Sequence, residues 1–269
     1  MTERKFRLPK DIPSDEFPKP ETFLEEARRL IEAARREGII LLVMGPIALH
    51  YYFPDHIDLY HRLERLGERV FTDIDYASYG KYRGKLVSFF ERQGYQIEKR
   101  ALMLSGGKRH IYFGETIPMI DVFFDRLEYN HPINYSRRLE IHPYCVSLTD
   151  LLLQKLQIVQ INDKDIKDAL LLMLATAVGE TDQGMINVRH LTKLMSDDWG
   201  FYYTATTNLQ KIKSAAANLP ALNGEHQNTI RYNINAILSA IESTPKTGRW
   251  KGREKVGTRK PWYNEVSDW

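Results

Sequence analysis

Hydrophobic and polar positions along the first half of the chain change repeatedly between the spacing of strands and the spacing of helices. Strand-like segments are predicted at 39–44, 70–76, 95–100, 109–113 and 117–124. Helices are predicted at 22–36, 47–52 and 81–93, and the polar, aromatic segment 53–69 is interpreted as a helix-containing insertion. This pattern predicts a small unit in which helices alternate with the strands of a mixed sheet.

Local signals predict where the first elements begin and end. Four prolines in the first twenty residues predict an extended arm without helix. Thr22 and Glu25 have the spacing of a capping box, which predicts that a helix opens there, and Gly38 is its predicted stop. The segment 105–108, Ser-Gly-Gly-Lys, is interpreted as a hairpin turn because it does not match a phosphate-binding Gly-x4-Gly-Lys-Ser/Thr loop.

From Ser147 onward the spacing is helical. Helices are predicted at 148–159, 165–178, 188–195, 208–217 and 227–241. The predicted fold class is therefore α+β, with a small mixed-sheet domain followed by a helical domain. The corresponding boundaries are an arm at 1–20, an α/β domain at 21–146, a helical domain at 147–245 and a basic tail at 246–269.

Composition places the chain among ordinary soluble globular proteins. The hydrophobic fraction is 43% and the charged fraction is 27%. No segment approaches the roughly 18–20 apolar residues of a membrane span, so no membrane partner is expected. The polar N-terminal sequence lacks the apolar stretch of a signal peptide, and the single cysteine, Cys145, suits a reducing compartment. These features predict a cytoplasmic protein.

The net charge of +3 is small, but cationic residues gather near the C-terminus. Residues 246–260 are dense in Lys and Arg, and Trp250 and Trp262 lie within or beside this stretch. Such a tail can follow a phosphate backbone and stack on bases. The alternative is a solvated, partly disordered C-terminus.

Asp73 and Asp75 are the most informative pair of charged residues. They lie at the end of a predicted strand, where side chains at positions i and i+2 share a face and their Cα atoms lie roughly 6.6 Å apart. Two carboxylates placed in this way repel each other unless a cation lies between them. Mg²⁺ suits the pair, because it takes one or two carboxylates and completes its octahedron with phosphate oxygens and water.

Asp121 adds a third carboxylate, because it interrupts the otherwise apolar segment 117–124. A charge in a buried strand is unfavourable unless it is paired or bound to a metal. The sequence therefore predicts that Asp73, Asp75 and Asp121 form one cluster, which holds a divalent metal against a nucleoside triphosphate. The alternative for Asp121 is a pair with a buried arginine or a turn cap.

The order of these features resembles the nucleotidyltransferase superfamily that includes DNA polymerase beta. A strand, a glycine turn at Gly45 and a helix precede the Asp-x-Asp strand, and a lone Asp follows on a later strand. The leucine-rich segment 151–156, which carries Lys155, precedes DKDIKDAL at 163–170. These segments resemble the branch of abortive-infection toxin nucleotidyltransferases (AbiEii-like), although Ala169 separates Asp168 from the leucine that follows it in that family. The resemblance covers about residues 39–174.

The resemblance implies a two-metal transfer reaction. Asp73 and Asp75 are implied to hold the metal that bridges the triphosphate, and Asp121 to complete a second site and help deprotonate the acceptor hydroxyl. Mg²⁺ is the implied cofactor, with Mn²⁺ as a substitute. The residues implied to contact the nucleotide are Gly45, Pro46, Thr72, Lys155 and Asp168. The implied partners are a nucleoside triphosphate, an RNA or protein acceptor and, if the protein is a toxin or phage-defence component, an antitoxin.

The chain departs from this family at the glycine turn. The family has Gly-Gly or Gly-Ser there, whereas this chain has Gly45-Pro46, and proline has no N–H for a phosphate contact. The interval between Gly45 and Asp73 is also longer than usual. A catalytically inactive nucleotidyltransferase-fold binding module is therefore the first alternative. A helical protein that binds nucleic acid through its basic tail is the second.

Overall fold

The computed structural model describes residues 7–64 and 69–266. The chain divides into two compact units. The first, here called the sheet unit, comprises residues 1–52, 66–127 and 134–146. The second, here called the helical unit, comprises 53–65, 128–133 and 147–269. The predicted fold class is confirmed, since the units are a mixed sheet with helices and a largely helical region.

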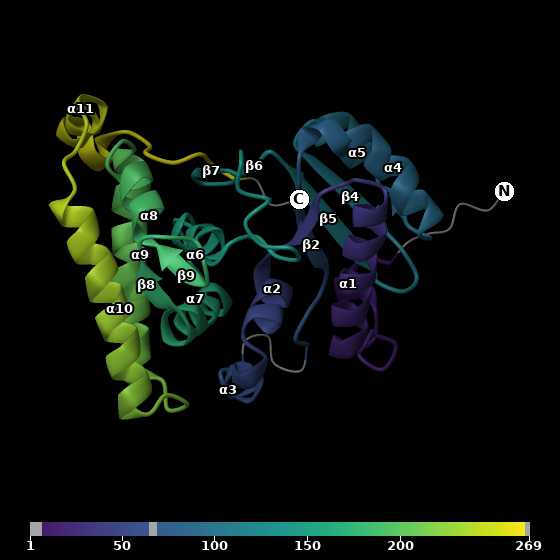
Figure 1. Cartoon of the computed structure of the whole chain (residues 1–269), viewed down its shortest axis with the longest axis horizontal. Coiled ribbons are helices and arrows are strands. Elements are labelled where there is room, and N and C mark those ends of the chain that lie inside the picture. Colours follow the sequence, from purple (N-terminus) through teal and green to yellow (C-terminus); the bar gives the residue numbers. More distant parts are fainter. Residues whose placement is uncertain (1–6, 65–68, 267–269) are drawn as a thin grey trace. The chain divides into compact units, whose positions relative to one another are not determined.

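The sheet unit is built on five strands, labelled in Figure 1 where there is room. The order across the sheet is β1-β2-β5-β4-β3. β2 and β5 are parallel, and the other neighbouring pairs are antiparallel. The strands are β1 (Leu41–Val43), β2 (Ile74–Ser78), β3 (Gln96–Ile97), β4 (Arg109–Phe113) and β5 (Met119–Phe124).

One face of this sheet is the core of the unit. Tyr76, Tyr112 and Val122 are fully buried, and side chains alternate between the two faces along each strand. The ring of Phe90, on helix α4 (Arg83–Arg92), lies 4.2 Å from Tyr112 and 6.4 Å from Tyr76, centroid to centroid. Asp75 is the sequence neighbour of Tyr76, and Asp121 is the sequence neighbour of Val122. Both aspartates therefore belong to the opposite face of the sheet.

Helix α1 (Pro20–Arg36) begins earlier than the sequence predicts. Its N-cap is Lys19, which makes no side-chain capping bond, and Pro20 is its first residue. The predicted capping box of Thr22 and Glu25 is therefore wrong. The fixed φ of proline suits the first helical position, where no intrahelical partner is needed for its nitrogen. The arm is also not free of helix, because η1 (Pro9–Asp11) forms one short 3₁₀ turn.

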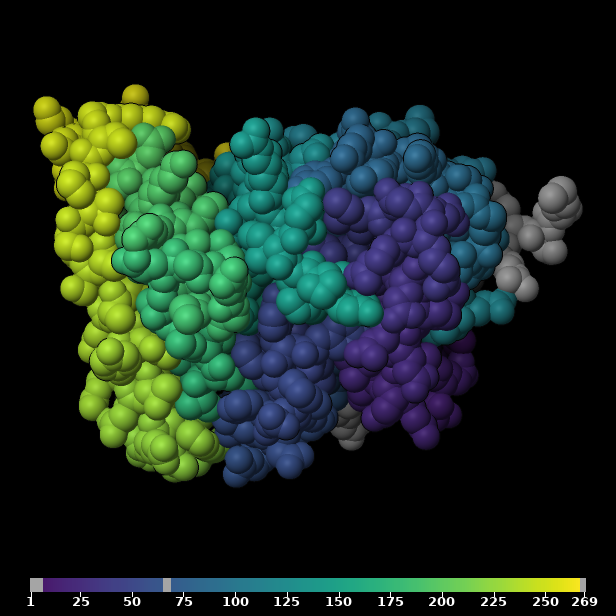
Figure 2. Space-filling view, viewed as in Figure 1, coloured from purple at the N-terminus to yellow at the C-terminus, as the bar shows by residue number. Residues whose placement is uncertain are grey.

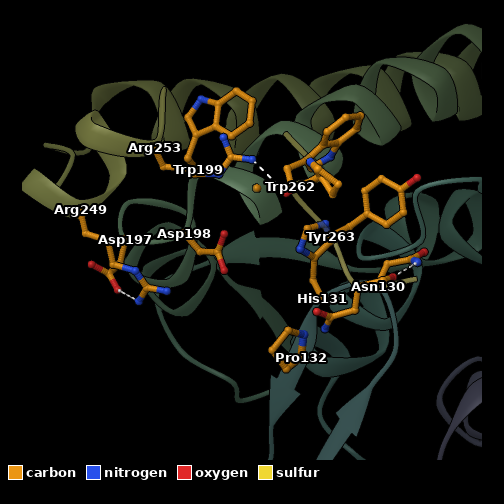
Figure 3. A pocket seen from close by; sticks show the side chains of 13 residues that line it. Asn130, His131, Pro132, Asp197, Asp198, Trp199, Arg249, Arg253, Trp262 and Tyr263 are labelled. Atoms are coloured by element: carbon orange, nitrogen blue, oxygen red, sulfur yellow. Dashed lines mark hydrogen bonds and ion pairs between the residues drawn. The ribbon is translucent and has the colours of Figure 1, made fainter. Parts of the chain in front are cut away.

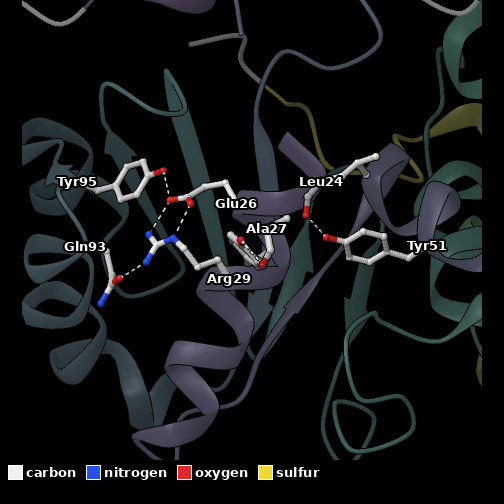
Figure 4. A network of polar contacts seen from close by, with 8 residues as sticks. Leu24, Glu26, Ala27, Arg29, Tyr51, Gln93 and Tyr95 are labelled. Carbon is white, nitrogen blue, oxygen red and sulfur yellow. Dashed lines mark hydrogen bonds and ion pairs between the residues drawn. The ribbon is translucent and has the colours of Figure 1, made fainter. Parts of the chain in front are cut away.

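A polar network attaches α1 to the sheet unit (Figure 4). Glu26 is buried and accepts hydrogen bonds from both Arg29 and the Tyr95 hydroxyl. Arg29 also donates to the side-chain oxygen of Gln93 at 2.6 Å. The hydrogen bonds from Arg29 and Tyr95 lower the pKa of Glu26 although burial acts in the opposite direction. This carboxylate is thus satisfied by its own neighbours.

The segment predicted as an edge strand at 95–100 is mostly not a strand. β3 contains only Gln96 and Ile97, and helix α5 (Lys99–Ser105) follows it directly. Glu98 is the N-cap of α5, where its side chain accepts the backbone N–H of Ala101. The Gly106-Gly107 turn thus connects α5 to β4 and is not a simple hairpin between β3 and β4. The remaining elements of this unit are α2 (Gly45–Tyr52) and η3 (Gly80–Tyr82).

The helical unit has α9 and α10 as its longest helices, and they lie side by side in Figure 1. The inserted segment also belongs to it. Its helices are η2 (Pro54–His56), α3 (Ile57–Arg62), α6 (Leu148–Leu156), α7 (Asp163–Ala175), α8 (Val188–Met195), α9 (Trp199–Asn218), α10 (Gly224–Ser243), α11 (Gly248–Val256) and η4 (Gly257–Arg259). The side chains of α10 and α11 form a continuous lime-to-yellow surface in Figure 2.

Four short strands follow the segment that was predicted to be the last one. β6 (Arg126–Glu128) and β7 (Pro132–Asn134) form a two-stranded sheet where the chain passes between the two units. β8 (Ala177–Gly179) and β9 (Met185–Asn187) form a parallel pair in the helical unit. These four strands were not predicted from the sequence. Each of these strands has three residues, which is too short for a periodic pattern to indicate.

The basic C-terminal segment is folded up to its described end. Thr247 caps α11 by accepting the N–H of Trp250 at 3.2 Å. Trp250 is buried, and its ring packs edge-on against Tyr202 at 5.1 Å. Lys246 lies over both rings, at 5.5 and 5.8 Å from their centroids. The prediction that Trp250 stacks on bases is wrong, because this ring belongs to the core of the helical unit.

Candidate functional site

Sheet topology brings together the three aspartates that the sequence singles out. Asp75 and Asp121 are direct partners in the register of the parallel strands β2 and β5. Asp73 lies just before β2, which begins at Ile74 and so starts later than predicted. One carboxylate oxygen from each residue lies within 4.8 Å of the other two. The predicted clustering of the three carboxylates is confirmed.

The cluster lies on the face of the sheet opposite the core helix α4. Asp73 and Asp75 are half-buried, whereas Asp121 is buried at 2% exposure. Thr72 supports the edge of the cluster, because its hydroxyl donates to Asp73 Oδ1 at 3.0 Å. The sheet therefore holds one deeply placed carboxylate and two that solvent partly reaches. This gradient suits a site that is open on one side.

Arg109 is the charged neighbour that the sequence did not identify as part of the site. Its guanidinium forms an ion pair and a hydrogen bond with Asp121 Oδ2. The alternative in which Asp121 pairs with an arginine is thus also realised, although Arg109 is half-buried. Arg109 lies on the same sheet face as Ile111, which the strand register places opposite Asp121, so the fold and not the sequence identifies it.

The ion pair with Arg109 offsets only part of the unfavourable effect of burying the Asp121 carboxylate. Burial raises its pKa from 3.8 to about 6, against the lowering effect of Arg109, and the nearby Asp73 charge raises it further. Among the residues that the structure describes, Asp121 Oδ1 is buried and has no hydrogen-bond partner. A buried carboxylate oxygen in this state is unfavourable, and a cation is one group that can satisfy it.

The donor set fits a small divalent cation with a preference for oxygen. Mg²⁺ binds oxygens at about 2.1 Å in an octahedron, so that two of its ligands lie roughly 3.0 Å apart when adjacent and 4.2 Å when opposite. The three oxygens lie within 4.8 Å of one another, about 0.6 Å more than the opposite-ligand distance, so the side chains would move closer around a shared ion. The Arg109 guanidinium balances part of the negative charge of the cluster. The residues present therefore fit such an ion.

Helix α2 begins beside the cluster. Gly45, its first residue, has φ +61°, and a Cβ placed there would lie 3.6 Å from Asp75 Oδ2. The preceding N–H, of Met44, donates to the backbone oxygen of Asp75 at 2.8 Å. Pro46 is the second residue of the helix and has no N–H. The glycine is required here for its backbone conformation, and its small size also leaves the start of the helix close to the carboxylates.

The other two residues predicted to contact a nucleotide, Lys155 and Asp168, lie in the helical unit. Lys155, on α6, is buried and places its Nζ 2.9 Å from Asp165 Oδ1 and 2.8 Å from Asp168 Oδ2, both on α7. Asp168 also accepts the hydroxyl of Tyr60. These four residues are here called the lysine cluster. Their contact with a nucleotide stays a prediction.

A separate cavity of about 390 Å³ opens in the helical unit (Figure 3). The C-terminal residues Trp262 and Tyr263 form part of its wall. Trp262 donates its Nε1–H to Thr204 at 3.1 Å, and Arg253 donates to the backbone oxygen of Pro261 at 3.1 Å. These contacts seat the C-terminal segment on α9. None of the residues predicted to hold the metal or to contact the nucleotide lines this cavity.

No helix in the described ranges is long and apolar enough to cross a membrane. Comparisons with known proteins give weak structural similarity. No protein-family model matches the chain, and no curated protein matches it significantly. The solution structure of the antibiotic-resistance factor ANT(2'')-Ia is similar over 65% of this chain and 94% of that chain, with 15% identity and a TM-score of 0.38. Similarity at this level does not assign the chain to a family.

Proposed function

We propose that this protein is a divalent-metal-dependent nucleotidyltransferase, which moves a nucleoside monophosphate from a nucleoside triphosphate to an acceptor hydroxyl. The observation that carries the proposal is the placement of three carboxylates within 4.8 Å of one another at the start of a helix. Mg²⁺ is the proposed cofactor, with Mn²⁺ as a substitute, because all three donors are hard oxygen ligands.

Each aspartate has a distinct part in the proposed reaction. Asp73 and Asp75, which solvent partly reaches, hold the cation beside the triphosphate, and Asp121 completes a second cation position. Bound cations in such a site stabilise the negative charge that develops on the attacking and leaving oxygens. Asp121, the most buried of the three, is also proposed to help remove the proton of the acceptor hydroxyl.

The bond changes are those of an in-line displacement. The acceptor oxygen loses its proton to Asp121 and forms a bond to the α-phosphorus. The bond from that phosphorus to the bridging oxygen breaks, and pyrophosphate leaves with the electron pair. Gly45 and the first turn of α2 bind the phosphates in this proposal, because a helix N-terminus favours anions and the glycine allows close approach.

The acceptor side of the proposal involves the helical unit. Exposed cationic residues of its C-terminal segment offer a surface for an RNA or an acidic protein acceptor; they are Arg249, Lys251, Lys255, Arg259 and Lys260. Lys155 and Asp168 are proposed to act on the nucleotide, and Thr72 to position Asp73 beside it. The proposed setting is a cytoplasmic toxin or phage-defence component with an antitoxin partner.

Transfer of label tests the proposal directly. The full chain is incubated with Mg²⁺, each α-labelled triphosphate in turn, and either total RNA or a protein extract as acceptor. Labelled acceptor with the wild type, none with Asp73→Asn, and unchanged labelling with Asp55→Asn, an exposed aspartate of the helical unit, would support it. If the wild type and Asp73→Asn give the same result with every acceptor, the catalytic proposal is wrong.

A binding module without turnover is the second candidate, and Pro46 is the observation that favours it. Proline at the second position of α2 removes one N–H that could bind a phosphate. Thermal unfolding separates the two candidates. Stabilisation by triphosphate only in the presence of Mg²⁺, without release of pyrophosphate, would favour the module. Pyrophosphate release by Pro46→Ser but not by the wild type would identify this proline as the cause.

A further inference from the structure

We propose that Arg109 is a built-in counter-ion of the carboxylate cluster, which holds Asp121 in place before a divalent cation binds and competes with that cation for it. The inference rests on the cation site of the proposed function. It assigns Arg109 a positioning role that acts through Asp121. It concerns how the Asp121 carboxylate is held in position when no cation is bound.

The strand register explains how Arg109 reaches Asp121. β4 and β5 are antiparallel, with Ile111 opposite Asp121 and Arg109 opposite Phe123. Arg109 and Asp121 are therefore diagonal neighbours on the same face, at a separation that a long side chain spans. The guanidinium Cζ lies 5.2 Å from the ring centroid of Phe123. The ion pair is thus fixed by two strands and one aromatic ring.

The pair divides the two oxygens of Asp121. Oδ2 accepts the guanidinium N–H, whereas Oδ1 is buried without a hydrogen-bond partner among the described residues. A cation bound through Asp121 would share this carboxylate with a guanidinium only one carboxyl group away. Like charges repel at such distances, and they do so more strongly in a partly buried site than in water. Arg109 therefore lowers the affinity of the cluster for a free divalent ion.

Phe123 gives the guanidinium a second stable position. A cation over an aromatic face is attracted by the ring even when its carboxylate partner is engaged elsewhere. Arg109 can thus loosen its bond to Asp121 and stay over Phe123 when a cation binds. A lysine would be less suited to this exchange, because only the planar guanidinium both stacks on the ring and forms directed bonds to a carboxylate.

Binding of Mn²⁺ to the full chain without nucleotide, measured by electron paramagnetic resonance, tests the inference. Arg109→Gln is expected to bind Mn²⁺ at least tenfold more tightly than the wild type. The control is Arg92→Gln, which removes an exposed arginine paired with Glu37 at 2.8 Å and should not change the affinity. Equal or weaker binding by Arg109→Gln, with binding retained in the wild type, overturns this inference alone. If neither protein binds Mn²⁺, the proposed cation site fails and the inference fails with it.

A second measurement uses the wild type and so does not depend on how Arg109→Gln folds. The ¹⁵N signal of the Arg109 guanidinium is assigned from its absence in Arg109→Lys. Saturating Mg²⁺ is expected to shift this signal and to speed the exchange of its N–H protons with water, because the bond to Asp121 loosens. A signal and exchange rate unchanged by Mg²⁺ that binds the cluster would overturn the inference. A purely structural ion pair would give that unchanged result.

Discussion

Each unit of the molecule buries carboxylates beside a cation, but the two groups differ in where that cation lies. In the lysine cluster, Lys155 lies between Asp165 and Asp168, and its Nζ is within 2.9 Å of an oxygen of each. In the carboxylate cluster, Arg109 pairs with Asp121 on β5, while Asp73 and Asp75 approach from the β2 segment. In the lysine cluster one cation contacts two carboxylates. In the carboxylate cluster three carboxylates gather, and the ion pair of Arg109 is with Asp121.

The comparison shows that buried aspartates alone do not indicate a metal site. Asp168 is completely buried, yet it forms an ion pair with Lys155 and accepts a hydrogen bond from the Tyr60 hydroxyl. Asp121 is buried to nearly the same degree, but one of its oxygens has no hydrogen-bond partner among the described residues. What distinguishes a candidate cation site is therefore a carboxylate oxygen that its own chain leaves unsatisfied.

The largest expected effect would come from neutralising the carboxylate cluster. Asp73→Asn or Asp75→Asn should lower the transfer rate by about 10³-fold or more, because the bound cation contributes several kcal/mol to the transition state. Rates with each variant under saturating Mg²⁺ measure the effect. Rates within threefold of the wild type would show that these carboxylates do not hold a catalytic ion.

Breaking the lysine cluster should affect folding first. Lys155→Met leaves two buried carboxylates without their shared cation, so we expect a loss of about 3–5 kcal/mol in the free energy of unfolding. Urea unfolding measures it. Arg92→Gln, which breaks an exposed pair, should change the stability by less than about 1 kcal/mol. A Lys155→Met variant that keeps the stability of the wild type would remove the contrast between the two clusters.

The pH dependence of the carboxylate cluster follows from the raised pKa of Asp121. Its pKa is about 6 in the folded chain, against an ordinary value of 3.8, so the cation-free fold binds this proton more tightly than the unfolded chain does. The stabilisation is complete below pH 3.8 and is lost as the pH rises through 6. The stability of the wild type relative to Asp121→Asn should therefore fall by up to about 3 kcal/mol over this range.

The same pKa predicts the opposite trend for cation binding. Mn²⁺ requires ionised Asp121, so its affinity should fall about tenfold for each pH unit below 6. Calorimetric titrations between pH 5 and pH 8 measure this slope. An affinity that does not change across this range would mean that Asp121 is not a ligand.

The smallest expected effect concerns the backbone beside the cluster. Gly45→Ala places a Cβ on a residue with φ +61°, which should reduce stability by about 1–2 kcal/mol, although the space around it is adequate. Gly252→Ala, inside α11 where a Cβ meets nothing within 4 Å, should instead increase stability by up to about 1 kcal/mol. Thermal unfolding of both variants measures the difference. Equal effects would contradict the required conformation at Gly45.

The sequence could predict the carboxylate cluster because each of its members carries a signal of its own. Asp73 and Asp75 share a face through their spacing, and Asp121 stands out in an apolar strand. Arg109 could not be predicted, because its approach to Asp121 depends on the register of β4 against β5, which hydrophobic pattern alone does not determine. The sequence reveals Asp121 as a charge in an apolar strand, but only the folded structure reveals that Arg109 is its partner.

The sequence analysis also missed two features whose structure is decided by contacts in the fold and not by the hydrophobic pattern. Trp250 lies in a stretch dense in charge, which is typical of a solvated tail, yet its ring packs against Tyr202 in the core. Helix α5 follows β3 because Glu98 supplies a cap for its first turn, where the sequence spacing indicated a longer strand. In both cases tertiary contacts or a single capping bond decided the structure.

The most direct test of the central claim is a crystal of the full chain soaked in Mn²⁺ and measured at the manganese absorption edge. The account predicts an anomalous peak among Asp73, Asp75 and Asp121, with carboxylate oxygens at about 2.2 Å from the ion and a lengthened contact between Arg109 and Asp121. No peak at this position under saturating Mn²⁺, with Arg109 still bonded to Asp121, would contradict it.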